Sequence, residues 1–277
     1  MAGKASKSTK KRSQTNKDDL DVIESGLPGQ FVEIYLSVLV YAWLMKDIIG
    51  RFFTNPFWYV DIQPDSENIN MDEVRRGTTA FGADLYAFWK TVQPGPDKSC
   101  LPENKRYSQP WRMWAVRLCN PSDPTWMGSD WGGKDFGDKE VAHRKAMTSA
   151  MCDHVLAGEF LQSMLKPLEG PEPIAQRRQS LDHVYQLAAD MSFRSWSHVQ
   201  HLEFGTLNNL NNRFSSEDAN LAMAYRYNLF TRRKRFEGHR ILSVMKPAIY
   251  ICGGMNDPSG RELLMPAEVV IDVDPDR

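Results

Sequence analysis

The chain has 277 residues, of which 42% are hydrophobic, including 8 Trp and 13 Phe. This content excludes a disordered chain, because so many apolar residues can form a sizeable core. A formal net charge of −1 gives no overall field for nucleic acid or an acidic membrane, so such a partner would need a local basic patch.

The four cysteines, at positions 100, 119, 152 and 252, are widely separated in the sequence. Their spacing matches no metal or redox motif, and their number is low for a secreted disulfide scaffold. The pattern predicts free, buried thiols in a reducing compartment, and therefore a nuclear or cytoplasmic protein.

Residues 1–25 are predicted to form a disordered basic tail, followed by a single globular domain over 26–277. Within the tail, the cations are Lys4, Lys7, Lys10, Lys11, Arg12 and Lys17. The run KSTKKR is compatible with a nuclear import signal, with an arm that contacts phosphates, or with a solubilising tail. Import and nucleic-acid contact are therefore hypotheses for this segment.

The uncharged stretch IYLSVLVYAWLM, residues 34–45, admits a core helix, a strand or a membrane anchor. A polar stripe interrupted by Leu44 follows helical spacing, at Glu33, Ser37, Asp47 and Arg51. The stretch is shorter than the about 20 residues of a membrane span, and it starts too late for a signal peptide. We expect a helix of the soluble core, with these residues on its wetter edge; a single-pass membrane-attached protein is an alternative.

Two aromatic runs predict strands: NPFWYVDIQP at 55–64 and WRMWAVRL at 111–118, in which Trp and Arg alternate. Between them, residues 70–92 predict a helix. Asn70 is its candidate N-cap, and Glu73 stands at the position that completes a capping box.

Two long helices are expected over 139–165 and 180–203, joined by a linker short enough for antiparallel packing. The core stripe of the first is Met147, Met151, His154, Gly158, Leu161 and Leu165. The core stripe of the second is Leu181, Val184, Ala188, Met191, Ser195, Val199 and Leu202. Both stripes follow helical spacing.

A third helix is expected to start near Ser215, with Asp218 completing its capping box. Further on, RILSVMKPAIYICGG and PAEVVIDVD, joined through a turn at NDPSG, predict a C-terminal β-hairpin in which Pro247 marks an edge or an irregular start. The predicted fold class is therefore α+β, predominantly helical with a small antiparallel sheet.

The spacing of Gly128, Gly133 and Lys134 matches a phosphate loop. However, Asp135 replaces the hydroxyl residue that would hold magnesium, no strand runs directly into the loop, and Gly137 interrupts the helix that should follow. We expect a structural surface loop, and a degenerate phosphate loop at 128–134 is the alternative.

The candidate metal ligands are Cys152, His154, His198 and His201. On a helix, Cys152 and His154 point about 200° apart and cannot share an ion. His198 and His201 follow Asp190 and Arg194, whose spacing suits an ion pair on a solvated stripe. We therefore expect no metal and no cofactor, with His154 a hydrogen-bonded core residue; an enzyme site of His and Cys between the two helices is the alternative.

A second basic run, TRRKRFEGHR, carries Arg232, Arg233, Lys234 and Arg235 beside Phe236. Interleaved aromatic and basic residues suit stacking and phosphate contact. Cations also stabilise the C-terminus of a helix, which is the alternative interpretation.

The passage from 180 to 273 contains LDHVYQLAADMSFRSWSHVQHLEF and FEGHRILSVMKPAIYICGGMNDPSGRELLMPAEVVID. It resembles uncharacterised proteins of filamentous fungi through a Leu-Ala helix with an aromatic-Trp pair, an acidic residue before Gly, a V-x-K-P-A-I strand and a Val-rich last strand. RELLMPAEVV departs from the aromatic second strand of that pattern. The resemblance covers about a third of the chain and implies a fungal, intracellular, non-catalytic protein without an active site.

The leading hypothesis is a non-enzymatic regulatory or scaffold protein of the nucleus or cytoplasm that acts by binding a protein partner. Its basic segments are candidates for nucleic-acid contact, and its oligomeric state stays open. An enzyme with a dispersed site and a membrane-attached protein are the alternatives.

Overall fold

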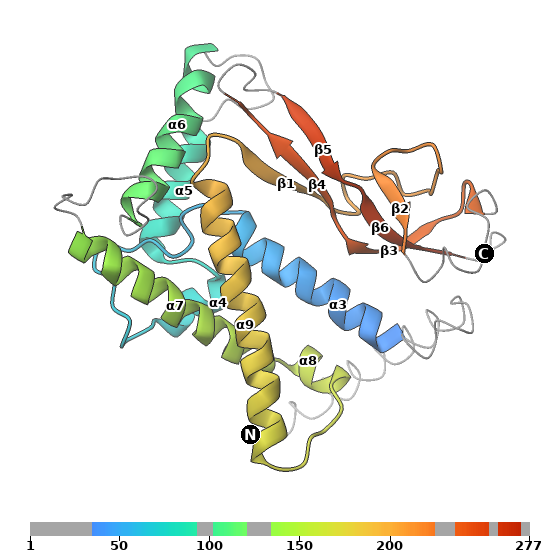
Figure 1. Ribbon diagram of the computed structural model, residues 1–277, viewed down its shortest axis with the longest axis horizontal. Helices are drawn as coiled ribbons and strands as arrows, with labels where there is room; N and C mark the ends of the chain where they lie inside the picture. Colours follow the sequence, from blue (N-terminus) through green and yellow to red (C-terminus); the bar gives the residue numbers. More distant parts are fainter. Residues whose placement is uncertain (1–34, 93–101, 121–133, 225–235, 255–259, 273–277) are drawn as a thin grey trace, which may run out of the picture. The chain divides into compact units, whose positions relative to one another are not determined.

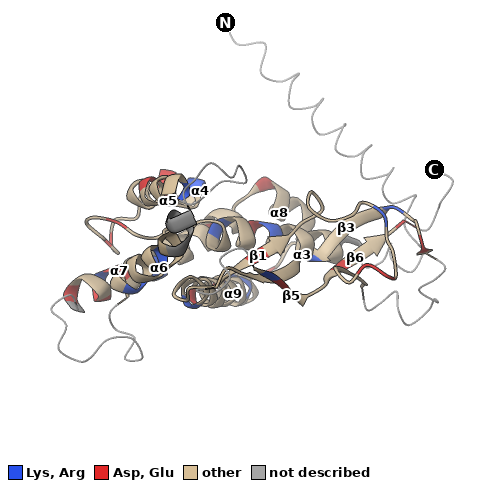
Figure 2. Cartoon of the chain, turned by 90° about the horizontal axis from the view of Figure 1, so that it is seen from above, with Lys and Arg blue, Asp and Glu red and all other residues tan. Residues whose placement is uncertain are grey.

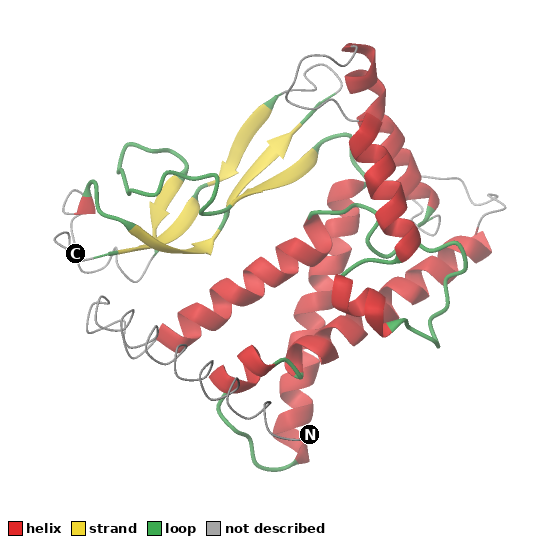
Figure 3. Cartoon of the chain, turned by 180° about the vertical axis from the view of Figure 1, so that it is seen from behind, coloured by secondary structure: helices red, strands yellow, loops and turns green. Residues whose placement is uncertain are grey.

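The computed structural model describes residues 35–92, 102–120, 134–224, 236–254 and 260–272 (Figure 1). The helical segments are α3 (Tyr35–Ile48), the π-helix η1 (Ile49–Phe53), α4 (Met71–Arg76), α5 (Ala80–Val92), α6 (Pro102–Leu118), α7 (Lys134–Leu156), α8 (Glu159–Met164) and α9 (Pro171–Trp196). The strands are β1 (His201–Gly205), β2 (Leu221–Met223), β3 (Ile241–Lys246), β4 (Ala248–Cys252), β5 (Arg261–Met265) and β6 (Ala267–Ile271). Helices predominate over strands, which confirms the predicted α+β class (Figure 3).

Contacts divide the chain into two compact units. Unit 1 takes its described residues from 35–43, 205–224, 236–248 and 265–272, and it holds the sheet of order β2-β6-β3. Unit 2 takes its described residues from between 44 and 204 and from 249–264. It therefore holds most of the helices and nearly all of the sheet of order β1-β4-β5.

The core of unit 2 lies where α9 crosses α7 obliquely and where η1 packs against α9 (Figure 1). Phe52, Trp58 and Tyr185 are fully buried there. The ring centre of Phe52 lies 4.9 Å from that of Trp58 and 5.7 Å from that of Tyr185, both in edge-to-face geometry. Such aromatic pairs add directional contacts to the burial of apolar area.

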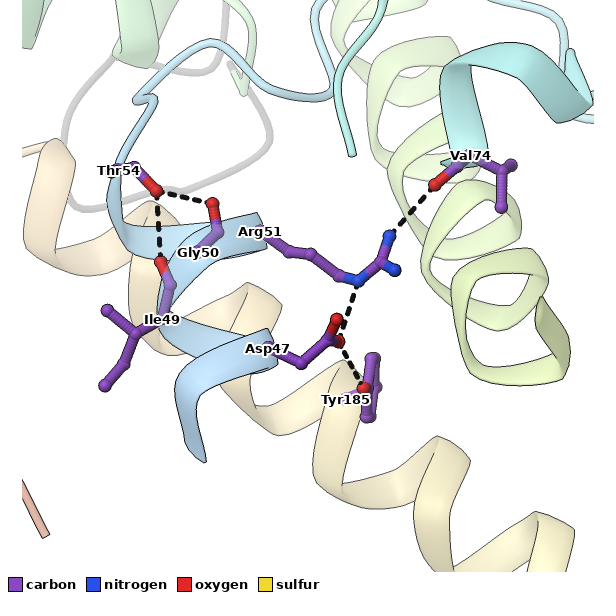
Figure 4. Close-up of polar contacts among 7 residues, drawn as sticks. All are labelled: Asp47, Ile49, Gly50, Arg51, Thr54, Val74 and Tyr185. Atoms are coloured by element: carbon purple, nitrogen blue, oxygen red, sulfur yellow. Dashed lines mark hydrogen bonds and ion pairs between the residues drawn. The ribbon is translucent and has the colours of Figure 1, made fainter. Parts of the chain in front are cut away.

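The helical reading of residues 34–45 is confirmed by α3, whose buried side chains include Val38 and Ile48. The predicted wetter edge is wrong at Asp47 and Arg51, which form a 2.7 Å ion pair and are largely buried. Tyr185 of α9 donates to Asp47 at 2.6 Å, and Arg51 donates to the Val74 carbonyl of α4 at 2.9 Å (Figure 4). This polar edge therefore connects α3 and η1 to both α9 and α4. Among the described helices, none combines the length and apolar composition that crossing a bilayer requires.

The strand expected over 55–64 is wrong, because residues 56–59 form turns that are buried on all sides. The backbone groups of this segment find partners outside any sheet: Thr79 N donates to the Trp58 carbonyl at 2.9 Å, and the Thr79 hydroxyl donates to that of Val60. Aromatic composition suits a buried turn as well as a strand when another segment, here the residue that precedes α5, supplies the hydrogen bonds.

The helix expected over 70–92 is interrupted at Gly77, whose φ of 76° ends α4 in the left-handed conformation. Asn70 caps α4 as predicted, accepting from Asp72 N at 3.0 Å. Glu73 does not complete the capping box, because its carboxylate accepts from Ala80 N at 2.8 Å, at the start of α5.

The strand expected over 111–118 is also wrong, since these residues are the second half of α6. Here the relevant period is that of a helix, because the buried positions recur at helical spacing: Ser108, Gln109, Arg112, Met113, Val116 and Cys119.

The helix expected over 139–165 is two helices, α7 and α8, separated at Gly158. The one expected over 180–203 is α9, which starts earlier and ends at Trp196, so that Leu202 belongs to β1. The predicted core stripe of α9 is displaced, because Val184 and Met191 are exposed. The buried face is Tyr185, Ala188, Ala189, Ser192, Phe193 and Trp196.

The third helix expected from Ser215 is absent from the part that the structure describes, where Leu221–Met223 is instead strand β2. Asp218 caps a turn, accepting from Asn220 N at 2.9 Å. β2 pairs with β6 in parallel, so a partner distant in sequence overrides the local capping signal.

The C-terminal hairpin is confirmed in outline, and each arm is divided by a proline. Pro247 separates β3 from β4, and Pro266 separates β5 from β6. β4 lies beside β5 in one sheet, and β3 pairs antiparallel with β6 in the other. Proline lacks the N–H that a strand interior needs, so both arms pass from one sheet to the next at a proline.

Candidate binding face on helix α6

Helix α6 carries an exposed row opposite its buried face. The side chains of the row recur at steps of four, three and four residues: Tyr107, Trp111, Trp114 and Leu118. Tyr107 is 64% exposed and Trp114 is 47% exposed, whereas Trp111 is half-buried. An apolar row at this spacing usually packs against another element of the fold. Its exposure on unit 2 is therefore typical of an interaction site.

The row extends to helix α5 through Phe88, which is itself exposed. The ring centres of Phe88 and Trp111 are 5.3 Å apart in edge-to-face geometry. The ring centre of the buried Phe57 lies 5.8 Å from that of Trp111. We call the set Phe88, Tyr107, Trp111, Trp114 and Leu118 the aromatic face. Trp111 is its fixed centre, because buried and exposed rings hold it from two sides.

Arg112 anchors α6 from its buried face. Its guanidinium is fully buried and lies 5.1 Å from the centre of the Trp196 ring. It donates to the carbonyl of Trp196, the last residue of α9, and to that of Val199, three residues further on. Burial lowers the pKa of Arg112 to about 9. The cation therefore occupies the negative end of the α9 dipole and fixes how α6 is presented.

A pocket of about 690 Å³ adjoins the C-terminal half of α6. Its walls come from α6, from the connection between α9 and β1, and from the ends of β4 and β5: Met113, Arg117, His198, Val199, Gln200, Ile251, Gly253, Gly254, Gly260, Arg261 and Glu262. At the strand ends, Gly253 has a φ of 70° and its N–H donates to the Gly260 carbonyl at 2.9 Å. A side chain is disfavoured at this conformation, so glycine at position 253 allows this hydrogen bond beside the pocket.

Two arginines give the pocket its chemistry. Arg117 donates to the Ser197 carbonyl at 2.9 Å, and its guanidinium carbon lies 5.1 Å from the centre of the Trp114 ring. Arg261 lies 3.4 Å from the centre of the Tyr250 ring and donates to Glu203 at 3.2 Å. Guanidinium groups fixed on aromatic rings are suited to carboxylate or phosphate recognition. Arg117 links this pocket to the aromatic face through Trp114.

His201 does not add a positive charge to this region. Burial, followed by the nearby Arg112 cation, lowers the pKa of His201 to about 4. Its ring is stacked on Trp196 with centres 5.5 Å apart, and Glu203 is 3.8 Å away. His201 is therefore neutral near pH 7 and serves as a packing residue of β1.

The candidate metal ligands are distributed over different elements. Cys152 is buried in α7 beside the Arg178 carbonyl, His154 is half-buried, His198 lines the pocket and His201 belongs to β1. The predicted stripe of His198 and His201 on a helix is wrong, and Asp190 pairs with Arg144 at 2.9 Å instead of with Arg194. Within the described ranges, no cluster of three or more His, Cys, Asp or Glu side chains is placed to hold a metal ion.

The described cysteines are Cys119, Cys152 and Cys252, and all three are free and buried, as predicted. Burial raises the pKa of each thiol to about 12. Because the thiolate is the nucleophile, none of these three is set up for covalent catalysis near neutral pH.

Two groups of predicted site residues lie outside the described residues. They are the basic segments with Lys4, Lys7, Lys10, Lys11, Arg12, Arg232, Arg233, Lys234 and Arg235, and residues 128–133 of the candidate phosphate loop. The flanks of that loop are described: helix α6 precedes it, and Gly137 lies inside α7, so the expected interruption there is wrong.

A buried polar cluster lies on α7, next to residues 59–61. Glu140 is fully buried; one of its carboxylate oxygens accepts from Asp61 N at 3.1 Å, and the other has no partner among the described residues. Arg144 is buried one turn away, with its guanidinium 5.5 Å from the centre of the Tyr59 ring. Burial raises the pKa of Glu140 to about 8, against the opposing effect of Arg144. This carboxyl is therefore largely protonated at neutral pH.

The fold and the aromatic face together define the class: an α+β protein that presents exposed Trp and Tyr side chains beside an arginine-containing pocket. No family model, curated protein or solved structure matches the chain. The resemblance of residues 180–273 to fungal sequences stays a prediction.

Proposed function

We propose that this protein is a non-enzymatic binding protein whose aromatic face takes a segment of a partner protein. The observation that carries the proposal is the exposed row on α6, with its helical spacing and its two exposed aromatic rings. The partner segment would place apolar side chains on this row and a carboxylate in the pocket, between Arg117 and Arg261.

The composition of the face favours a protein over other ligands. Trp, Tyr and Arg are the residues that most often dominate binding energy at protein interfaces. Trp and Tyr bury a large area and lose little conformational entropy, and Arg adds bidentate hydrogen bonds. Trp111 is already fixed by its neighbours, and Arg117 lies over Trp114. Because these side chains are already ordered in the free protein, binding a partner loses less of its interaction energy to fixing their conformations.

Single-stranded nucleic acid is the competing ligand, since bases stack on exposed aromatic rings. Such sites follow the backbone with an uninterrupted positive groove. Here Glu262 lines the pocket and Glu203 accepts from Arg261, so negative charge interrupts the positive surface. This arrangement supports a segment that carries one or two carboxylates at fixed places.

The test is a peptide-display selection against the full chain, followed by fluorescence anisotropy of the selected peptides. We expect peptides that combine large apolar residues with Asp or Glu. Trp114→Ala and Arg117→Ala should each weaken binding at least about tenfold, the usual effect at an interface hot spot. Ile62→Ala is the matched control, because Ile62 is exposed and lies outside the aromatic face.

Peptides that bind the Trp114→Ala variant as tightly as the natural chain would contradict the proposal. A 20-nucleotide oligo(dT) probe that binds more tightly than any selected peptide, with strong salt dependence, would assign the face to nucleic acid instead.

We also propose that the protein acts in the nucleus as a regulatory or scaffold protein, which the basic composition of residues 1–17 supports. Short runs rich in Lys and Arg are typical of nuclear import signals.

A further inference from the structure

Strand β5 is an outer strand of the sheet of order β1-β4-β5, and four of its five residues are exposed. Its exposed residues include Leu264 at 59% and Met265 at 46%. After Arg261 and Glu262 the strand continues with three uncharged apolar residues, which are tan in Figure 2. Outer strands are usually protected by Lys, Pro or a bulge, and β5 contains neither Lys nor Pro. An exposed apolar edge of this kind is typical of a place where another strand is added.

The hairpin connection shows which backbone groups of β5 face this edge. Gly253 N donates to the Gly260 carbonyl at 2.9 Å, so residue 260 directs its backbone groups toward β4. Along an antiparallel strand these groups alternate between the two sides. Those of Arg261, Leu263 and Met265 therefore face outward. In the part of the chain that the structure describes, no strand lies beside β5 on this side.

The outward edge begins at the arginine-containing pocket. Arg261 and Glu262 belong both to β5 and to the walls of the pocket, together with Ile251 of β4. The guanidinium of Arg261 lies 3.4 Å from the centre of the Tyr250 ring, which holds the charge at the start of the strand. A segment with a carboxylate in the pocket would therefore continue onto the outward backbone groups of β5.

The charges of β5 favour a partner with its own sequence over a second copy of this chain. When two copies of a strand pair about a two-fold axis, the residue on the axis lies opposite itself. An axis at Arg261 or Glu262 places like charges opposite each other, which is destabilising. An axis at Leu263 or Leu264 places both charged residues opposite uncharged ones. A partner segment can instead carry an opposite charge at these positions.

We propose that the partner segment binds as an added strand along the outer edge of β5, with its carboxylate at the end that borders the pocket. This inference rests on the proposed function and specifies how the same partner is held. Backbone hydrogen bonds then supply affinity, and the carboxylate sets the direction and register of the added strand. Pairing with all five residues of β5 requires an extended segment about 17 Å long.

The first test is amide hydrogen exchange of the isotope-labelled full chain, measured by NMR with the tightest peptide from the selection. In the free chain, the amides of Arg261, Leu263 and Met265 should exchange quickly. When the peptide occupies about nine tenths of the sites, they should exchange about tenfold more slowly, because only the free tenth stays open.

Unchanged exchange at these three amides with the peptide bound would overturn strand addition. Slowing that appears without peptide, as the protein concentration is raised, would assign the edge to a second copy and would also overturn the proposal.

The second test replaces single N–H groups of the peptide by N-methyl groups. Every second residue of an added strand donates to β5, so methylation at alternating positions should weaken binding at least about tenfold. Methylation at the positions between them should weaken binding less than about threefold. A loss without this alternation would overturn the proposal.

A matched pair of variants tests the same contact on the chain itself. Leu263→Pro removes an outward N–H, and an outer strand tolerates proline at such a position. This variant should bind the peptide at least about tenfold more weakly. Leu263→Ala keeps the N–H and should bind within about threefold of the natural chain. Circular dichroism checks that both variants fold, and the N-methyl series decides the question if Leu263→Pro does not.

Failure of this inference can be distinguished from failure of the proposed function. Peptides that bind Trp114→Ala weakly and Leu263→Pro at full strength would support the aromatic face and overturn strand addition. Peptides that are weakened by Leu263→Pro and not by Trp114→Ala would contradict the proposed function and support the added strand. A selection that returns no binding peptide would overturn both.

Discussion

Arg112 is a buried cation that donates its hydrogen bonds to neutral acceptors. It donates to Gln109 Oε1 at 3.1 Å and to two carbonyls at the end of α9. Removing its charge from water has a cost, which the lowered pKa reflects. The carbonyls compensate, because the C-terminal groups of a helix lack intrahelical donors.

We expect Arg112→Met to lower the free energy of unfolding by about 2 kcal/mol, since two carbonyls would lose their donor inside the protein. Met retains most of the volume, so the effect isolates the hydrogen bonds. Urea denaturation measures it, with Arg75→Ala as the control, because the Arg75 pair with Asp72 is exposed and should contribute below about 1 kcal/mol. Equal stability of the Arg112→Met variant and the natural chain would contradict the anchoring role.

Glu140 makes stability depend on pH. Its pKa rises from 4.5 in the unfolded chain to about 8 in the fold, mainly through burial. Between these values the folded state binds more protons than the unfolded state, so stability falls as pH rises through this window. The contribution is complete below pH 4.5 and is lost above pH 8.

Glu140→Gln should remove this pH dependence, because the amide keeps an acceptor for Asp61 N and does not ionise. At pH 9 the variant should be more stable than the natural chain by up to about 5 kcal/mol, at about 1.4 kcal/mol for each pKa unit between 4.5 and 8. Urea denaturation of both proteins at pH 5 and pH 9 tests this. A stability difference that is the same at both pH values would contradict a buried, protonated Glu140.

At the scale of single elements, the sequence predicts well those structures that depend on neighbouring residues. It predicts poorly those that depend on contacts with distant residues. The α3 helix, the Asn70 cap and the two-armed C-terminal hairpin depend on nearby residues and are confirmed. Residues 55–64 have the composition of a strand but find their hydrogen bonds at Thr79. A hydrogen-bond donor about twenty positions away produces no periodic pattern in the sequence of residues 55–64, so it could not be predicted from that segment.

The candidate site shows the same limit. Tyr107, Trp111, Trp114 and Leu118 stand at helical spacing in the sequence, but the alternation of Trp and Arg at 111–114 suggests a strand. A test of both periods over 105–120 would have revealed the row. The pocket could not be predicted, because α6, β1, β4 and β5 converge from distant parts of the chain.

The α5 helix depends on a glycine for its close approach to residues 57–60. A Cβ atom at Gly82 would lie 2.0 Å from the Phe57 carbonyl oxygen and 2.7 Å from the Thr79 hydroxyl. The first of these atoms belongs to the backbone and cannot rotate away, so the turn would have to move.

We expect Gly82→Ala to destabilise the protein by on the order of 2–4 kcal/mol, although alanine favours helices. The control is Gly50→Ala, where nothing lies within 4 Å of the added atom and where stability should be unchanged or rise by up to about 1 kcal/mol. Thermal unfolding compares the two variants. Similar melting temperatures for both would show that α5 can separate from the buried turn without cost.

At the scale of the whole molecule, unit 1 is assembled from separate parts of the chain. In its sheet, β2 and β3 precede strands β4 and β5 of unit 2 in the sequence, and β6 follows them. Neither unit therefore corresponds to one continuous fragment: a deletion inside 205–248 would remove part of unit 1, and one inside 44–204 or 249–264 would remove part of unit 2.

The basic segment at residues 1–17 can be removed without cutting either sheet or any described helix. If it directs import, a fluorescently tagged chain should accumulate in the nucleus, and the chain lacking 1–17 should not. Replacing Lys10, Lys11 and Arg12 by Gln is the matched variant that keeps the length. An unchanged distribution in both variants would contradict nuclear targeting by this segment.

The position of β6 has a consequence for biosynthesis. β6 lies between β2 and β3 and pairs with both of them, and its residues Ala267, Val269 and Ile271 are buried. A ribosome makes β2 and β3 first, so both strands precede their common partner during synthesis. Until residues 267–271 emerge, their backbone groups and apolar side chains are open to chaperones or to other nascent chains. This sheet can therefore form completely only after its middle strand, the last of the three in sequence, has been synthesised.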